Sequence, residues 1–166
     1  MRTLERDELK ELLVKCWMTH DGMWFYHCMQ ECGIEKASRI NGAAARSVGM
    51  VEVKRIQKAF GVGEIETFER LKECFGPFFD VVKGDFMHVT YSFPSHNTIH
   101  FEMEDCFAYK GIKRIGGIDR YDCGIFERVS GWFDGLEIPH RVTPETKGCM
   151  FHTEGQCFRD FTFTLR

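Results

Sequence analysis

Residues 86–105 read FMHVTYSFPSHNTIHFEMED, and this stretch decides the fold class. Apolar residues recur at every second position on either side of segment 94–97, whose residues favour turns. We therefore expect two β-strands, over 86–93 and 98–105, joined by a turn. The polar residues of the second strand all fall on one side, which predicts that this side faces water. They are His100, Glu102 and Glu104.

The sequence before this hairpin has the period of α-helices. Apolar residues recur at intervals of three or four over 7–32, and Gly33 is suited to end that helix. A second helix is expected over 35–60 and a third over 64–75. Small residues fill the middle of the second helix and would let another backbone approach it closely, so this helix is a candidate surface for a homo-oligomer. They are Gly42, Ala43, Ala44, Ala45, Ser47 and Gly49.

The sequence after the hairpin mixes the two periods. Helical spacing returns over 122–136, and alternation of apolar residues with threonine predicts a strand over 156–166. Three N-terminal helices packed on an antiparallel β-sheet, with a further helix between strands, define an α+β fold.

The length of the chain fits one domain. Its 166 residues are enough to bury most apolar surface in one core, and no repeat, linker or low-complexity tract divides them. We expect a single domain over 1–166, with a helical part, 1–76, and a cysteine-rich part of strands and helix, 77–166.

The charge pattern limits the classes of partner. The formal net charge is −3, and the two signs are interspersed without a basic stripe, so nucleic acid is not expected as a partner. No apolar run reaches the roughly 18 residues that span a bilayer, and the N-terminal residues MRTLERDE are too charged for a signal peptide. We therefore expect a cytoplasmic protein without membrane contact, in which the eight cysteines stay reduced.

Four cysteines in the last third of the chain are the leading candidates for chemistry. They are Cys106, Cys123, Cys149 and Cys157, separated by 16, 25 and 7 residues and surrounded by aromatic residues. Thiolate is a soft ligand that suits zinc or iron, usually in tetrahedral sites. Because no pair has zinc-knuckle spacing, the fold would have to bring the four sulfur atoms together.

Two other interpretations of these thiols remain open. A cysteine can pack as a small apolar residue and is often buried. A thiol can also be reactive, and Cys106 and Cys123 each follow an aspartate that is suited to cap a helix. The positive end of a helix dipole lowers a thiol pKa, whereas the adjacent carboxylate raises it.

A second candidate site lies in the first helix. His20 and Asp21 combine an imidazole with a carboxylate, a pair that serves in acid–base catalysis or as metal ligands. His20, Trp24 and His27 share one helical face, and histidines on such a face are also common as packed residues. The catalytic candidates are therefore His20, Asp21, Cys106 and Cys123.

The sequence lacks several motifs with known chemistry. There is no G-x-G-x-x-G, P-loop, H-E-x-x-H or G-x-S-x-G motif. No nucleotide cofactor is therefore expected.

Two parts of the chain resemble known families. Residues 16–25, CWMTHDGMWF, and the order of the C-terminal cysteines resemble an uncharacterised prokaryotic cytosolic family, the domain of unknown function numbered 6125. The same cysteine order is similar to aminothiazoline-carboxylate hydrolase-like proteins, which implies hydrolysis of a C–N or C–S bond on a small ring. The ending 145–157 resembles the 4-vinyl reductase domain, which implies a pocket for a hydrophobic or tetrapyrrole-like ligand.

We expect a small-molecule-binding protein whose pocket lies between the N-terminal helices and the sheet. Aromatic side chains would form its apolar wall and the four thiols its edge, with zinc or iron as the candidate cofactor. The wall residues are Trp17, Trp24, Tyr109 and Trp132. A small metal- or thiol-dependent hydrolase and a non-catalytic structural or partner protein with buried thiols are the alternatives.

Overall fold

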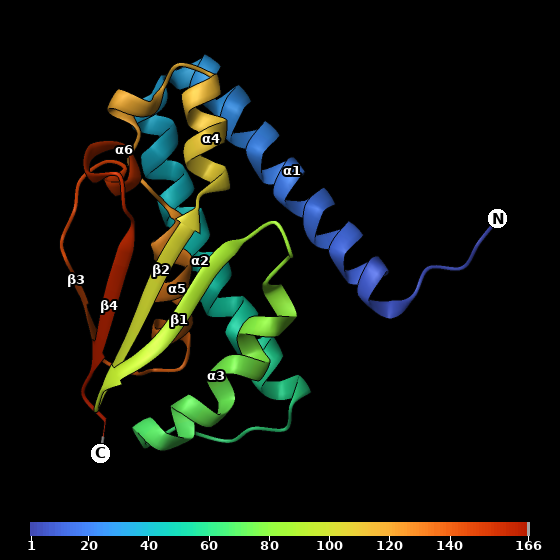
Figure 1. Ribbon diagram of the computed structural model, residues 1–166, viewed down its shortest axis with the longest axis vertical. Helices are drawn as coiled ribbons and strands as arrows, with labels where there is room; N and C mark the ends of the chain where they lie inside the picture. Colours follow the sequence, from blue (N-terminus) through green and yellow to red (C-terminus); the bar gives the residue numbers. More distant parts are fainter. Residues whose placement is uncertain (166) are drawn as a thin grey trace.

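The computed structural model describes residues 1–165, and Figure 1 shows how their helices and strands are arranged. In chain order the elements are α1 (Arg6–Cys32), α2 (Ile34–Ala59), α3 (Phe68–Val82), β1 (His88–Ser95), β2 (Thr98–Asp105), α4 (Phe107–Arg114), the short 3-10 helix η1 (Ile118–Arg120), α5 (Ile125–Gly135), β3 (His140–Thr143), α6 (Met150–Glu154) and β4 (Phe158–Phe163).

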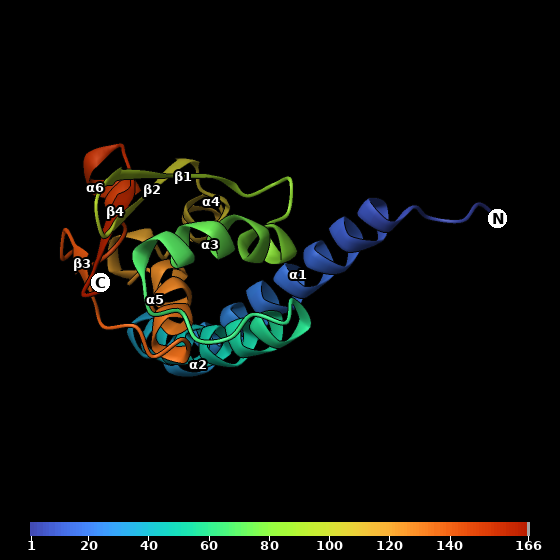
Figure 2. The same ribbon diagram turned by 90° about the horizontal axis from the view of Figure 1, so that it is seen from below.

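Most of the helical residues lie in two layers on one side of the sheet (Figure 2). α3 and α5 cover the sheet, and α2 packs on α5 with α1 beside it. Aromatic rings join the first layer to the sheet. The ring centroid of Phe75 in α3 lies 5.6 Å from that of Phe101 in β2, and Phe133 in α5 lies 4.6 Å from Phe163 in β4. The expected α+β fold is confirmed.

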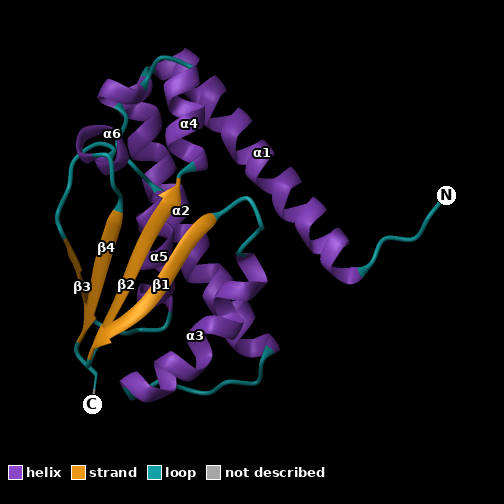
Figure 3. Cartoon of the chain, in the orientation of Figure 1, coloured by secondary structure: helices purple, strands orange, loops and turns teal. Residues whose placement is uncertain are grey.

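The four strands form one antiparallel sheet in the order β1-β2-β4-β3 (Figure 3). Asn97, with φ of 63°, supplies the left-handed residue of the tight turn that joins β1 to β2. Alternate residues of β2 are buried against the helices, namely Ile99, Phe101 and Met103. The opposite side is polar, as expected, and there His100 Nδ1 lies 2.7 Å from Asp160 Oδ1 across the strands.

Glycines let α2 and α5 approach closely. A Cβ atom on Gly49 of α2 would lie 2.2 Å from the carbonyl oxygen of Arg128. A Cβ atom on Gly131 of α5 would lie 2.1 Å from the carbonyl oxygen of Arg46. The small middle of α2 therefore admits another backbone, as predicted, and the backbone it admits is that of α5 in the same chain.

The third helix begins and ends later than its sequence pattern indicates. Thr67 caps it by accepting a hydrogen bond from the backbone N–H of Arg70 (3.2 Å), so the helix starts at residue 68 rather than 64. It then continues through Pro77 to Val82, although proline usually ends a helix. Burial of aromatic residues on both sides of the proline, such as Phe78, outweighs this effect. The helix thus crosses residue 76, where the helical part was expected to end.

Four short elements are absent from the sequence-based expectations. They are α4, η1, β3 and α6, with 8, 3, 4 and 5 residues. A periodic pattern needs about 11 residues to identify a helix, so elements of this length carry too few apolar positions to be recognised.

The first helix differs from the others in its surroundings. Its N-terminal half projects from the body of the molecule (Figures 1 and 2). Val14 and Phe25 are its buried residues, whereas Leu13 and Trp24 are 60% and 62% exposed. Within residues 1–165, no helix combines the length and apolar character that crossing a bilayer requires.

Candidate functional site

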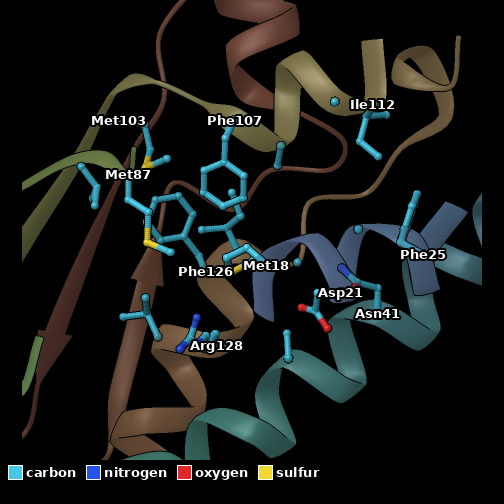
Figure 4. Close-up of a pocket in the computed structure, with 18 of the residues that line it drawn as sticks. Met18, Asp21, Phe25, Asn41, Met87, Met103, Phe107, Ile112, Phe126 and Arg128 are labelled. Carbon is cyan, nitrogen blue, oxygen red and sulfur yellow. The ribbon is translucent and has the colours of Figure 1, made fainter. Parts of the chain in front are cut away.

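A cavity of about 620 Å³ lies between α1 and the body of the protein. Side chains from α1, α2, α3, β1, β2, α4 and α5 line it. Methionine and phenylalanine from five separate segments form its apolar end (Figure 4). They are Met18, Met87, Met103, Phe107 and Phe126. Methionine side chains are flexible and polarisable, so this end can adapt to ligands of different shape.

A few polar side chains occupy another part of the cavity wall. Asp21 of α1, Asn41 of α2 and Arg128 of α5 all line it, and Figure 4 shows Asp21 next to Asn41, with Arg128 apart from them on the side of Phe126. A mostly apolar wall with a few placed polar groups is the usual composition of a small-molecule site.

The carboxylate of Glu52 holds Arg128 in place. It accepts hydrogen bonds from Arg128 Nε (3.0 Å), Arg128 Nη2 (2.6 Å) and Trp132 Nε1 (2.7 Å). The side chains of Arg128 and Glu52 are only 20% and 14% exposed. The Arg128 guanidinium also lies 4.4 Å from the ring centroid of Trp17. The positive charge of Arg128 is therefore already balanced where it borders the cavity.

Replacing Glu52 with alanine is expected to lower the free energy of unfolding by about 3 kcal/mol, because it leaves a shielded guanidinium and an indole N–H without their acceptor. Urea unfolding at pH 7, followed by circular dichroism, measures this change. Glu73→Ala is the control, since the Glu73–Arg70 pair is exposed and should contribute less than about 1 kcal/mol. Equal losses in the two variants would contradict a structural role for the Glu52 network.

One of the four predicted wall residues lines the cavity. It is Trp132, which lies on the inner side of α5. Trp17 instead lies beneath the Arg128 guanidinium, Trp24 is exposed, and Tyr109 packs against Phe151 with ring centroids 5.2 Å apart. For Trp17 and Trp24 the rotation of α1 explains the difference, because it turns Met18, Asp21 and Phe25 toward the cavity. Apolar residues surround α1 on all sides, so its sequence pattern does not show which side faces inward.

The four C-terminal thiols interact with one another inside the protein. Burial raises the pKa of Cys123 to about 11 and of Cys157 to about 12, and it also raises the pKa of Cys106. Other thiols of the set, Cys149 included, add to each rise, because a nearby negative charge disfavours ionisation. Such mutual influence requires the four sulfur atoms to lie in one region.

Tyr121 connects this thiol region with the cavity. None of the cysteines lines the cavity, but Tyr121 does. Burial raises the pKa of Tyr121 well above its usual value, and the charge of Cys123 adds to the rise. The thiols therefore lie behind the cavity wall. The sequence had predicted them at the edge of the cavity.

Arg159 is a buried cation next to the thiols. It is 7% exposed, and its charge acts to lower the pKa values of Cys123 and Cys157 against the larger effect of burial. Its hydrogen-bond and ring contacts in residues 1–165 are with neutral groups, namely the Phe158 carbonyl, the Met150 sulfur, the Thr146 hydroxyl and the Phe126 ring. Arg159, Phe161 and Phe163 occupy every second position of β4, so they lie on the same side of the strand, and this spacing is the sequence signal that places Arg159 inside.

No metal arrangement is formed by the thiols as they stand. Among the described residues, no three His, Cys, Asp or Glu side chains are placed to hold a metal ion. The metal site at Cys106, Cys123, Cys149 and Cys157 therefore stays a prediction.

The aspartates before Cys106 and Cys123 do not cap helices. Cys106 itself is the N-cap of α4, and its sulfur accepts a hydrogen bond from the backbone N–H of Tyr109 (3.4 Å). Asp105 instead pairs with Lys110, and Asp122 accepts a hydrogen bond from the Gly148 N–H (2.8 Å). Burial raises the Cys106 pKa more than the helix N–H groups lower it, which works against a reactive thiolate at neutral pH.

His20 and Asp21 point in different directions. Neighbouring residues of a helix are separated by about 100° around its axis. Asp21 lines the cavity, whereas His20 is exposed and does not. The expected acid–base pair is therefore not assembled on α1.

Comparison with protein families gives one match. The sequence model of a family of unknown function (DUF6125) matches residues 2–149. The chain belongs to this family. No curated protein and no solved structure matches the chain. The matched range contains every residue that lines the cavity, and three of the four thiols, but assigns no activity to them.

Proposed function

We propose that the protein binds a mainly apolar small molecule in the cavity between α1 and the body of the fold. The observation that supports this most is the cavity itself. Its volume of about 620 Å³ falls within the range of about 300–1,000 Å³ typical of small-molecule sites, and its wall is mostly apolar. No cavity of this size is needed to complete a core of ordinary packing density.

The polar residues of the wall indicate the kind of head group that the ligand carries. The Asp21 carboxylate and the Asn41 amide offer acceptors to the cavity. Arg128 attracts an anion only weakly, because Glu52 already neutralises it. Lys83 and Arg114 also line the cavity, so its wall offers groups of both charges to a polar end of the ligand.

Filling the cavity at Ala45 should block binding. Ala45 lines the cavity, whereas the adjacent Ala44 is exposed, so the same substitution at the two positions gives a matched pair. With N-phenyl-1-naphthylamine as the fluorescent probe, Ala45→Phe is expected to raise the dissociation constant at least about 10-fold, equivalent to about 1.4 kcal/mol. Ala44→Phe should leave it unchanged.

Absence of saturable probe binding by the wild type would contradict the proposal. Equal affinity of Ala45→Phe and the wild type for the probe would show that the probe binds outside the cavity, and this result would also contradict the proposal. Thermal unfolding of both variants shows whether each one is folded when the probe is added.

A second candidate function is the binding of one soft metal ion, zinc or iron, by the four thiols. The observation that favours it is the buried Arg159 beside them, whose hydrogen-bond partners among residues 1–165 are all neutral. A buried charge is strongly unfavourable without compensation, and a metal centre with four thiolates would supply negative charge at this place. The proposal extends to binding alone, because His20, one of the candidate acid–base residues, is exposed on α1.

Elemental analysis of untagged protein tests the metal directly. We expect about one zinc or iron ion per chain, and loss of that ion in Cys157→Ser. Cys16→Ser is the control, because Cys16 is exposed and does not belong to the set. Metal-free wild-type protein after expression with added zinc and iron would exclude this candidate and leave the cavity proposal intact.

A further inference from the structure

One end of the cavity is closed to solvent. We define the aromatic end as Phe75, Phe79, Phe101 and Trp132, which line the cavity from α3, β2 and α5. Phe75, Phe101 and Trp132 are only 2%, 1% and 4% exposed, and Phe79 is partly buried against the same core. Water therefore has little access to this end.

The other end is polar and reaches the surface. We define the open end as Asp21 and His27 of α1 and Arg114 of α4, which line the cavity and are all exposed. The second half of α1 and the end of α4 lie at the upper end of the molecule in Figure 1, whereas α3 lies at the lower end. A polar group of a ligand that stays at the open end keeps its hydrogen bonds to water or to these side chains.

The rings of the aromatic end pack against one another. The ring centroid of Phe75 lies 5.6 Å from those of Phe79 and Phe101, and that of Phe79 lies 6.4 Å from that of Trp132. The indole N–H of Trp132 already donates a hydrogen bond to Glu52. A polar group that entered this end would lose its hydrogen bonds to water without replacement, which is unfavourable. The aromatic end therefore favours hydrocarbon.

Methionines lead from the aromatic end toward the open end. Met103 is two residues from Phe101 in β2, so both lie on the same side of the strand. Figure 4 shows Met18 between the pair Met87 and Met103 on one side and Asp21 on the other. Methionine side chains are flexible and fill irregular space, so this middle part can adapt to a flexible alkyl chain.

We infer that the ligand is a single-chain amphiphile, whose alkyl chain reaches the aromatic end and whose polar group stays at the open end. The inference rests on the proposed function, since it names the class of molecule that the same cavity binds. A ligand without an elongated apolar part would either leave the closed end empty or carry its polar group into it. The aromatic end thus sets the longest chain that fits.

A homologous series of alkane-1,2-diols tests the chain, because the polar group stays the same and only the chain length changes. Displacement of N-phenyl-1-naphthylamine gives the dissociation constant of each compound, from hexane-1,2-diol to tetradecane-1,2-diol. Each further buried methylene group is expected to lower the dissociation constant about 4-fold, equivalent to about 0.8 kcal/mol. The gain should stop at the length at which the chain reaches the aromatic end.

Two isomers test the orientation of the ligand. Decane-1,2-diol and decane-1,10-diol contain the same atoms, but the second carries a hydroxyl group at each end of its chain. It has to place one hydroxyl group in the apolar part of the cavity, so we expect it to bind at least about 10-fold more weakly.

Phe79→Ala tests whether the aromatic end limits the chain. It removes one ring from the closed end and leaves space there, so the gain in affinity should continue to longer chains than in the wild type. Phe79→Leu should give a smaller shift in the same direction. Phe60→Ala is the matched control, because Phe60 is 50% exposed and does not line the cavity, and it should keep the wild-type limit. Thermal unfolding shows whether each variant is folded.

Three results would overturn the inference. They are affinities that do not depend on chain length, equal affinities for the two decanediols, and a series that ends at the same length in the wild type and in both folded Phe79 variants. If Ala45→Phe still weakens binding of the fluorescent probe, any of these results excludes the amphiphile and leaves the proposed cavity function in place. Failure of the wild type to bind the probe would contradict both.

Discussion

Replacing Gly131 with alanine is expected to lower the free energy of unfolding by more than about 3 kcal/mol. The added Cβ atom would lie 2.1 Å from the carbonyl oxygen of Arg46 and 2.9 Å from its carbonyl carbon. Both atoms belong to the backbone of α2, so no side-chain rotation can relieve the contact. α5 would have to move away from α2 and would take Trp132 and Phe133, two buried core residues, with it. Urea unfolding followed by circular dichroism measures the loss.

Gly22→Ala is the matched control for this prediction. Gly22 lies inside α1, and a Cβ atom there would meet nothing within 4 Å. Alanine is favoured over glycine inside a helix, so this variant is expected to gain about 0.5–1 kcal/mol. The same added methyl group should thus have opposite effects at the two positions. Similar losses at both would show that the close approach of α2 and α5 does not control stability.

The contact between α2 and α5 also shows what the sequence can and cannot predict about packing. The small residues in α2 indicate that another backbone comes close, and they do so without structural information. They do not show which backbone this is. A helix of a second copy fits the pattern as well as a helix of the same chain does. Gly131 and Gly135 mark α5 as the partner helix. In a sequence, however, two glycines within 11 residues indicate a lower helix propensity rather than a packing contact.

An apolar cavity between the N-terminal helices and the sheet was predicted, but most of its wall residues were not, and the thiols expected at its edge do not line it. An aromatic-rich chain with helices before a sheet indicates an apolar pocket between them, and Trp132 was assigned to its wall. The orientation of α1 decides the remaining wall residues. Apolar residues such as Leu13 and Met18 occupy opposite sides of this helix, so its sequence pattern is compatible with either side facing inward.

The thiol region depends on contacts that are distant in sequence. Its cysteines belong to the starts of α4 and α6 and to the segments before α5 and β4, and only the fold brings these together. Arg159 was the missed member, although the alternation along β4 indicates its inward position. A buried arginine contradicts the usual exposure of charged residues, which is why composition alone does not reveal it.

The metal-free protein is expected to lose roughly 6 kcal/mol of stability between pH 8 and pH 11 through two of its thiols. Burial raises the pKa of Cys123 to about 11 and of Cys157 to about 12 in the folded protein. In the unfolded chain both thiols ionise near pH 8.5. The unfolded state therefore loses two protons that the folded state keeps, and stability falls as the pH rises. The contribution is complete below about pH 8.5 and disappears as the pH passes the folded pKa values.

The slope of stability against pH isolates these two groups from other alkaline titrations. Each thiol that is ionised only in the unfolded state contributes about 1.4 kcal/mol per pH unit. Urea unfolding under reducing conditions from pH 8 to pH 11 should therefore give a flatter slope for the double variant Cys123→Ala, Cys157→Ala than for the wild type. Between pH 9 and pH 11 the two slopes are expected to differ by about 2–3 kcal/mol per pH unit. Cys16→Ala, which removes an exposed thiol, should keep the wild-type slope.

The same measurement separates the metal candidate from buried neutral thiols. A bound zinc or iron ion requires the thiolate form, so cysteines that hold it are already deprotonated at neutral pH. The alkaline loss attributed to Cys123 and Cys157 would then be absent, and stability would instead fall in acid as protons displace the metal. A wild type with the alkaline slope of the double variant would contradict the raised pKa values. A steep alkaline loss that the double variant lacks would show that the thiols are buried in their protonated form beside Arg159.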